Sequence, residues 1–144
     1  MKENNSFLEV EIMTPQDVKF KGTALSINVP AIDGRIGVLT HHAPLVALVE
    51  AGETRVETDV KTFIFANGQG FIWVNENKAS LMLDRCFKPE EIDYDESMEK
   101  IKDIKNSIKG REKSLDYDVI ILNGQLKVEN AKITVYQKVF GYKK

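Results

Sequence analysis

Hydrophobic and polar residues alternate through most of the first half of the chain, in short runs separated by turn residues. In the first run, Leu8, Val10 and Ile12 alternate with Glu9 and Glu11, which is the period of a half-buried strand. Runs that recur every ~8–12 residues with turns between them predict an all-β sandwich. The ranges predicted as strands are 8–12, 18–21, 25–29, 54–56, 62–65, 71–74 and 80–83.

The pattern changes after Pro89, where the chain becomes densely charged and strand alternation stops. Met98, Ile101, Ile104 and Ile108 recur at spacings of three and four, which predicts a helix with a narrow apolar stripe. We therefore predict two domains. A β-sandwich occupies residues 1–88, and a helical segment occupies residues 89–144.

The segment 119–139 carries two conflicting signals. Ile121, Val128 and Val135 fall seven residues apart and share one helical face with Gly124 and Ala131. However, an Asn-Gly pair between apolar runs is a strong hairpin signal, and residues 132–136 alternate like a strand rich in β-branched residues. Local propensity alone leaves helix and strand open.

Net charge and cysteine content narrow the range of functions. The formal net charge of −2 provides no general attraction to nucleic acid or to an anionic membrane surface. The single cysteine, Cys86, cannot form an internal disulfide, and its apolar neighbour Phe87 favours a buried, unreactive thiol. No hydrophobic run approaches the ~18 residues of a membrane-spanning helix.

Residues 33–48 contain the ingredients of a chemical site, including both histidines of the chain. His41 and His42 are adjacent, so their side chains diverge and make poor ligands for one metal. No nucleophile elbow and no phosphate-binding loop is present. Gly68 and Gly70 are better explained by a bend where another backbone approaches closely. We expect no catalytic residues, no metal and no cofactor, and favour a binding or structural role.

Several segments in chain order resemble the epsilon subunit of F-type ATP synthases. They are FLEVEIMTP, DGRIGVLTHHAPLVALVEAG and NGQGFIWVNENKASLML, followed by a charged helix and a second segment that begins with Asp116-Tyr117. The resemblance is most specific from Gly34 to Gly52, where the family pattern is G-x-x-G-(aliphatic)-x-x-x-H-A-P-L followed by Pro or Ala and Gly. It implies a β-sandwich followed by an antiparallel two-helix hairpin, which favours the helix for residues 116–139, with the face of Gly124 and Ala131 against the first helix.

The resemblance also implies a function. The chain would be a non-catalytic part of the central stalk that links the gamma subunit to the c-ring. Its C-terminal helices would restrain ATP hydrolysis, reaching the alpha and beta subunits when extended. The expected location is peripheral, on the cytoplasmic face of the bacterial plasma membrane. The alternative from another class is a free-standing β-sandwich that acts as a ligand-binding or adaptor module.

The positions that match the family pattern imply roles for individual residues. The loop 33–37, which comprises Asp33, Gly34, Arg35, Ile36 and Gly37, would face the c-ring, although the family often has an acidic residue where Arg35 stands. His42 and Pro44 would lie at the gamma interface. A second interpretation of His42, which stays open here, is that its ring only satisfies a loop carbonyl.

The helical segment supplies two further expectations. Some family members bind ATP through an I/L-D-x-x-R-A motif. Ile92 and Asp93 match its start, whereas Glu96 and Ser97 replace the arginine and alanine, so ATP binding is expected to be weak or absent. The basic residues Lys105, Lys109 and Arg111 are expected to contact acidic surface on the catalytic subunits and contribute to inhibition.

Overall fold

The computed structural model describes residues 7–142, so the first six residues of the predicted sandwich domain and the last two of the chain lie outside it. The described part is a β-sandwich followed by two helices, as predicted. The strands are β1 (Leu8–Met13), β2 (Val18–Ala24), β3 (Ser26–Ala31), β4 (Gly34–Leu39), β5 (Leu45–Val49), β6 (Gly52–Glu57), β7 (Thr62–Asn67), β8 (Gly70–Asn75), β9 (Lys78–Leu83) and β10 (Cys86–Phe87).

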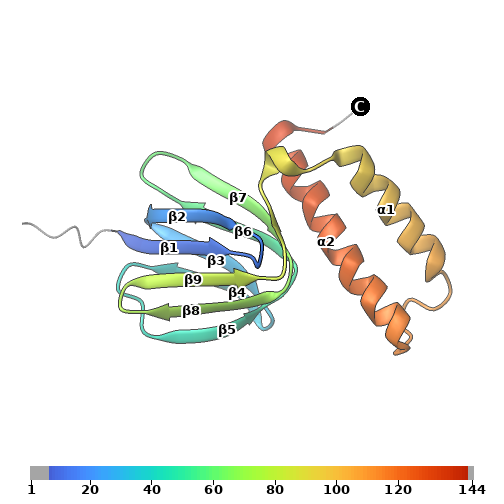
Figure 1. Cartoon of the computed structure of the whole chain (residues 1–144), viewed down its shortest axis with the longest axis horizontal. Helices are drawn as coiled ribbons and strands as arrows, with labels where there is room; N and C mark the ends of the chain where they lie inside the picture. The colour runs from blue at the N-terminus through green and yellow to red at the C-terminus, as the bar shows by residue number, and fades with distance from the viewer. Residues whose placement is uncertain (1–6, 143–144) are drawn as a thin grey trace, which may run out of the picture.

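Hydrogen bonds connect the strands in the order β10-β7-β6-β3-β5-β8-β9-β1-β2, with β4 paired to β3 alone. Most neighbours are antiparallel, but β1 and β9 are parallel. The sheet folds over on itself into two layers, so that β2 and β7, near its opposite ends, lie close together (Figure 1). Side chains pointing inward from both layers form the core, which includes Leu8, Ile27, Val56, Ile72 and Leu81.

Gly70 lets β8 lie closely against β9, and Gly68 lies just before β8. A Cβ atom on Gly70 would overlap the carbonyl oxygen of Met82, which is backbone, as the sequence led us to expect. A Cβ atom on Gly68 would meet side chains instead, those of Asp84 and Arg85. The hairpin between β8 and β9 turns through Glu76 and Asn77, whose φ angles are 49° and 60°, a conformation that fits a two-residue turn.

The chain changes to helix directly after β10. A 3-10 turn, η1 (Pro89–Glu91), leads to helix α1 (Tyr94–Ser107) and then to helix α2 (Tyr117–Phe140). Residues 119–139 are therefore helical throughout, and the hairpin and strand signals at 123–124 and 132–136 are wrong. The division into domains at residue 88 stays a prediction.

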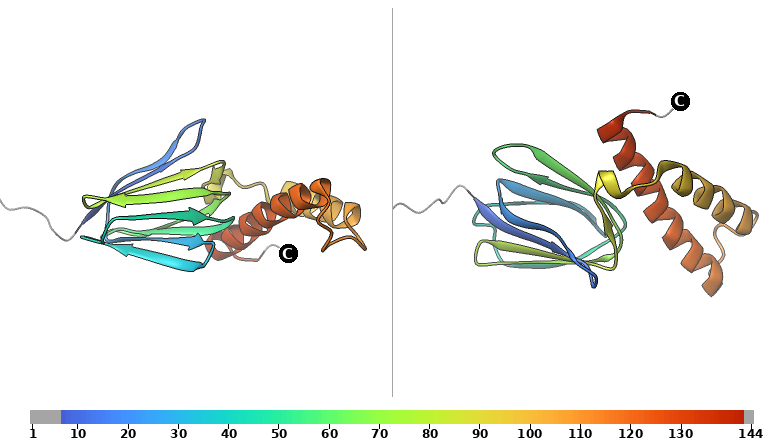
Figure 2. Two further views of the ribbon diagram at one scale, coloured as in Figure 1. Left: turned by 90° about the horizontal axis from the view of Figure 1, so that it is seen from below. Right: turned by 45° about the horizontal axis from the view of Figure 1, so that its top comes forward.

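The two helices lie antiparallel beyond one end of the sandwich, with α2 nearer to the strands (Figure 2). Ile104 and Ile108 are buried against Val119 of α2, as the stripe predicted. Met98, by contrast, is 43% exposed, and Ser97 is buried. Ser97 lies four residues before Ile101 and therefore continues the buried face formed by Ile101, Ile104 and Ile108.

The prediction for the apolar face of α2 needs a correction. Ala131 and Val135 pack against Ala66 of β7 and Ile92, not against α1. A Cβ atom on Gly124 would meet nothing within 4 Å, so no helix approaches closely there. The face with the seven-residue spacing is turned toward the sandwich, and α1 contacts a different face that contains Val119 and Leu122.

Candidate functional site

The outer face of strands β5 and β8 is unusually apolar for an exposed surface. In both strands alternate residues point into the core, and the residues between them point outward. The outward residues pair directly across the two strands, Val46 with Trp73 and Leu48 with Phe71. Their exposed fractions are 69%, 51%, 62% and 39%, respectively. An antiparallel sheet with one solvated face normally carries polar residues at such positions.

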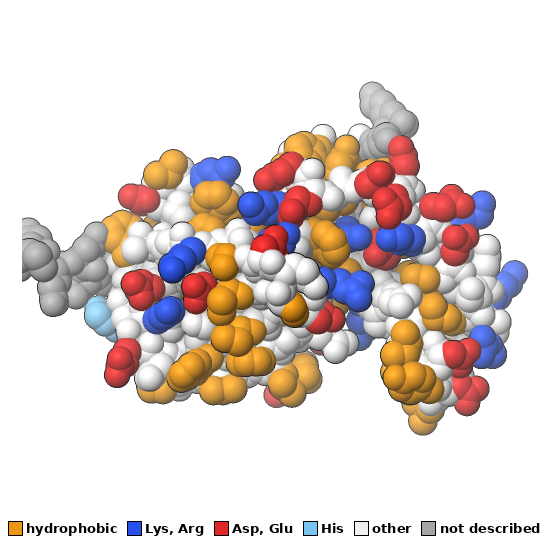
Figure 3. Space-filling view, in the orientation of Figure 1, with side chains coloured by type: hydrophobic (Ala, Val, Ile, Leu, Met, Phe, Trp, Pro, Cys, Tyr) orange, Lys and Arg blue, Asp and Glu red, His pale blue; other side chains and the backbone are white. Residues whose placement is uncertain are grey.

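A fifth apolar side chain extends this surface. Ile32, in the turn after β3, is 56% exposed, and its backbone N–H donates to the Leu48 carbonyl oxygen at 3.1 Å. We call Ile32, Val46, Leu48, Phe71 and Trp73 the outer apolar strip. Figure 3 shows hydrophobic side chains gathered over this lower part of the sandwich. Contiguous exposed apolar surface of this kind marks interaction sites on soluble proteins.

Sequence reasoning missed the outer apolar strip, although a signal was present. The segments 45–49 and 71–74 are apolar at every position, not only at alternate ones. Such runs are expected in strands that are buried on both faces. In a two-layer sandwich one of those faces points outward, so the pattern required an exposed apolar face.

The predicted loop 33–37 differs from the structure. Gly34–Leu39 is strand β4, and the turn that precedes it consists of Ile32 and Asp33. Gly34 has a φ of 122°, a conformation that favours glycine and lets the chain reverse into β4. The exposed tip is therefore shorter than predicted, because Arg35, Ile36 and Gly37 pair with β3.

Arg35 does not lie at the tip of this hairpin. Its Nε donates to Asn28 Oδ1 at 2.5 Å, and its Nη2 donates to the Glu53 carbonyl oxygen at 2.7 Å. The guanidinium thus spans β4, β3 and β6. It lines an open groove of about 610 Å³ together with Thr134 and Lys138 of α2. Arg35 faces the helical hairpin instead of projecting toward a partner beyond the tip.

His42 and Pro44 lie between β4 and β5, directly before the outer apolar strip begins at Val46. The Nδ1 of His42 is 2.7 Å from the Ala43 carbonyl oxygen, so the tautomer protonated on Nδ1 donates to it. This contact corresponds to the second interpretation of His42, a ring that satisfies a loop carbonyl. Within residues 7–142 no group of three or more His, Cys, Asp or Glu side chains is arranged to hold a metal ion.

Cys86 has the environment expected of an unreactive thiol. The residue is 3% exposed in the sandwich core. Burial raises the pKa of its thiol to about 12, so the nucleophilic thiolate is scarce at neutral pH.

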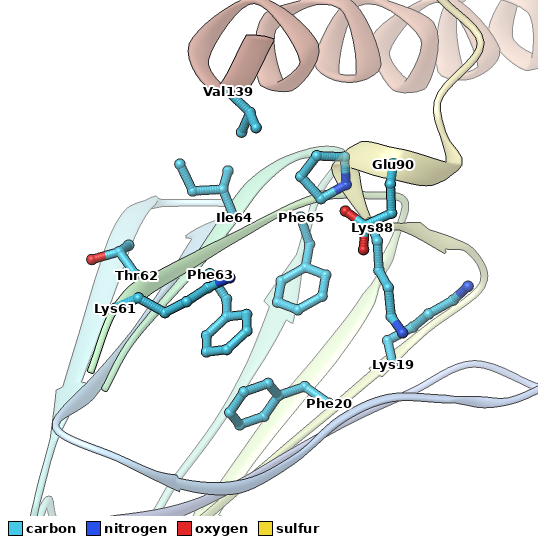
Figure 4. A pocket seen from close by; sticks show the side chains of 11 residues that line it. Lys19, Phe20, Lys61, Thr62, Phe63, Ile64, Phe65, Lys88, Glu90 and Val139 are labelled. Atoms are coloured by element: carbon cyan, nitrogen blue, oxygen red, sulfur yellow. The ribbon is translucent and has the colours of Figure 1, made fainter. Parts of the chain in front are cut away.

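A cavity of about 270 Å³ lies where β2 and β7 meet, under η1 and the end of α2 (Figure 4). Phe20 and Phe63 point toward each other in an edge-on contact, with ring centroids 5.3 Å apart. Lys19 at its rim is bound by Glu91 at 3.0 Å and by Asp17 at 3.2 Å. Burial lowers the pKa of Lys19, but these two carboxylates outweigh it and leave the pKa above its ordinary value. The lysine therefore ties η1 to β2.

The predicted nucleotide residues have structural roles. The Asp93 carboxylate accepts a hydrogen bond from the Glu96 N–H at 3.0 Å and caps α1, and Ile92 is buried against α2. Glu96, where the motif has arginine, pairs with Lys100 at 2.9 Å.

The three basic residues of the helical segment differ in their surroundings. Arg111 bonds to Asp118 at 3.2 Å and to the Ser107 carbonyl oxygen at 3.0 Å, which joins the two helices. Lys105 and Lys109 are exposed, and neither forms an ion pair within the described part of the chain.

Comparison with known proteins gives consistent results. A family described as ATP synthase, Delta/Epsilon chain, beta-sandwich domain matches residues 7–89. The ATP synthase epsilon chain of Roseiflexus sp. is 36% identical over 86 residues, which cover 60% of this chain and 62% of the relative. That of Protochlamydia amoebophila is 31% identical over 105 residues, which cover 72% and 71%, respectively. The chain thus spans less than two thirds of the Roseiflexus protein.

One solved structure extends the similarity into the helices. A chain of the Euglena gracilis mitochondrial ATP synthase, in a structure of OSCP, F1 and c-ring, superimposes with a TM-score of 0.72 at 18% identity. The superposition covers 92% of this chain and 82% of the other, so the two share a fold. Because the family match covers more than half of the chain, this protein belongs to the ATP synthase epsilon-chain family.

Proposed function

We propose that this chain is the non-catalytic epsilon subunit of the central stalk of an F-type ATP synthase, where it links the gamma subunit to the c-ring. The outer apolar strip carries the proposal, because a free-standing module would leave that surface in water. Similar folds occur in the Euglena structure and in a Tetrahymena thermophila ATP synthase structure of the central stalk and c-ring, with a TM-score of 0.55 at 12% identity.

Gamma is the partner that we assign to the outer apolar strip. Trp73 and Phe71 offer the aromatic anchors that dominate binding energy at protein interfaces. His42 and Pro44 stand at the edge of the strip and would contribute to its rim. Asp33 and Gly34, at the turn before β4, are the part of the predicted c-ring loop that remains free to meet a second partner.

The location follows from this assembly. Among residues 7–142, neither helix combines the length and hydrophobicity needed to span a lipid bilayer. The subunit would reach the cytoplasmic face of a bacterial plasma membrane through its partners in the complex.

Co-purification tests the proposal directly. The full chain, tagged and mixed with gamma and the c-ring, should retain both through washing. Retention of neither would favour the alternative, a free-standing ligand-binding or adaptor module. A parallel pull-down with the c-ring in the absence of gamma shows whether the turn before β4 is sufficient to bind the c-ring.

The helical hairpin would restrain ATP hydrolysis by contacting the alpha and beta subunits when extended. Reversing Lys105 and Lys109 to glutamate should raise ATPase activity of the assembled enzyme. The new glutamates would be repelled by the acidic surface of the catalytic subunits, and this repulsion would weaken the inhibitory contact. Arg111 is left in place because its reversal would also break its bond to Asp118. Lys61→Glu is the control, because Lys61 is an exposed sandwich lysine that forms no ion pair in the described part of the chain. Unchanged activity in the double variant would remove these lysines from the inhibitory role.

ATP binding at the start of α1 is expected to be weak or absent. Asp93 is already used as a helix cap, and Glu96 would repel phosphate. Calorimetric titration of the full chain should show no micromolar affinity. Restoring the motif with Glu96→Arg and Ser97→Ala should strengthen binding, and micromolar affinity in the unmodified chain would contradict the expectation.

A further inference from the structure

The sandwich has a seam that backbone hydrogen bonds do not close. In the order of paired strands β2 lies at one end, with β7 and β10 at the other, and within the described residues no pairing links β2 to β7. Side chains fill this seam instead. The ring of Phe20 on β2 meets the rings of Phe63 and Phe65 on β7 edge-on, with centroids 5.3 and 6.4 Å apart, respectively. The cavity of about 270 Å³ lies at this seam.

The floor of the cavity is apolar. Phe20, Phe63, Ile64 and Phe65 line it from the sandwich, and Val139 lines it from the end of α2. Figure 4 shows Val139 on the opposite side of the cavity from the rings. Phe65 is 2% exposed whereas Val139 is 45% exposed, so the cavity runs from the edge of the core to solvent. An apolar chain that entered from the surface would displace water from these side chains.

Lysines stand around the opening of the cavity. Figure 4 shows Lys61 on one side and Lys88, with Lys19, on the other. Lys19 is occupied by the two carboxylates described above. The Lys61 ammonium lies 4.5 Å from the centre of the Phe63 ring, a cation–π contact. Lys88 forms neither an ion pair nor a ring contact within residues 7–142, so its ammonium is available to a ligand.

The charges around the opening favour an anion over a cation. Among the described residues that line the cavity, Glu90 is the only acid and is accompanied by three lysines. The acids that hold Lys19 lie outside this lining. A carboxylate placed at Lys88 would gain charge-assisted hydrogen bonds, whereas a ligand cation would be repelled by the same ammonium.

The volume of the cavity limits the size of the ligand. At roughly 30 Å³ for each water molecule, 270 Å³ corresponds to about nine waters, so a ligand of about ten non-hydrogen atoms fits. A nucleotide is too large for this space. Octanoate has the required size, with an unbranched chain for the apolar floor and one carboxylate for the lysine.

We propose that this cavity binds a medium-chain aliphatic carboxylate, with the chain against Phe20, Phe63 and Val139 and the carboxylate at Lys88. The ligand would contact β2, β7, η1 and α2 together. This inference goes beyond the proposed function, because the outer apolar strip lies mainly on β5 and β8 and shares no residue with the cavity. Lys61, whose ammonium already lies over a ring, would contribute less to binding of the carboxylate.

Calorimetric titration of the full chain with octanoate tests the proposal. We expect a submillimolar dissociation constant, which is an ordinary affinity for a ligand of about ten non-hydrogen atoms. Octylammonium has the same chain and the opposite charge, and it should bind about 10-fold more weakly or worse. Butyrate should also bind about 10-fold more weakly or worse, because it buries fewer methylene groups.

Variants of the chain locate the site. Lys88→Met should weaken octanoate binding about 2- to 5-fold, the range of a partly exposed ion pair, and Lys127→Met on α2 is the matched control. Val139→Glu should weaken binding about 10-fold, because it places a like charge beside the ligand. Val139 is partly exposed, so the fold should tolerate this change, and thermal melting should confirm it. Trp73→Ala should leave octanoate binding unchanged.

Four results would overturn the proposal. Octanoate could fail to bind, octylammonium could bind as tightly as octanoate, or Lys88→Met could match Lys127→Met. Trp73→Ala, rather than Val139→Glu, could remove binding, which would place octanoate on the outer apolar strip. The titration uses the isolated chain, so its result is independent of the pull-down with gamma and the c-ring. Failure of that pull-down would count against the proposed function alone.

Discussion

Gly70→Ala is expected to lower the free energy of unfolding by about 3 kcal/mol, toward the upper end for overpacked cores. The added Cβ would overlap the Met82 carbonyl oxygen, and backbone cannot move aside as a flexible side chain can. Gly70 pairs with Leu83 at the start of β8, so relief would require β8 and β9 to separate there. Urea denaturation would measure this loss in the free energy of unfolding. The melting temperature should fall by about 10 °C.

Gly124→Ala is the matched control and should have the opposite sign. Gly124 lies inside α2 with open space around its Cβ position. Alanine is the better helix former by roughly 0.8–1 kcal/mol, so this variant should be more stable. Equal destabilisation of both variants would contradict the described packing, because it would require a neighbour close to Gly124.

Trp73→Ala is expected to weaken binding to gamma about 30- to 1000-fold, corresponding to the ~2–4 kcal/mol of a central aromatic anchor. Trp73 lies in the outer apolar strip opposite Val46 and is half exposed, so the isolated fold should tolerate its truncation. The affinity can be measured by surface plasmon resonance with immobilised gamma. Thermal melting should confirm that the variant is folded.

Tyr142→Ala provides the comparison for this variant. Tyr142 is an aromatic residue that is 81% exposed beyond the end of α2, away from the strip. Its truncation should leave the affinity for gamma unchanged. If both truncations have the same effect, or neither has any, the strip is not the docking surface.

The sandwich was predictable because its strands obey a local rule. Strands with one face in the core alternate hydrophobic and polar residues, as Leu8–Met13 does, and turn residues mark their ends. Helix α2 was not predictable from local propensity. Burial of Val128, Ala131 and Val135 stabilises the helix despite the glycine at 124 and the β-branched residues near its end.

The candidate site was harder to predict than the fold. Matching to the family pattern pointed to the segment 33–44, which does adjoin the outer apolar strip. Which side chains point outward, however, depends on the pairing of β5 with β8, and that pairing joins residues far apart in the sequence. For the same reason Arg35 was assigned to the tip, although its partners Asn28 and Glu53 belong to β3 and β6.

Docking of gamma on the outer apolar strip can be tested with the single tryptophan of the chain, Trp73. Incorporating 5-fluorotryptophan into this chain alone gives one ¹⁹F signal that reports on the strip. Adding unlabelled gamma should shift that signal and shield it from solvent, and Tyr142→Ala should leave this response intact. A signal that stays unshifted and solvent-accessible while gamma is bound would place the interface elsewhere and contradict the account.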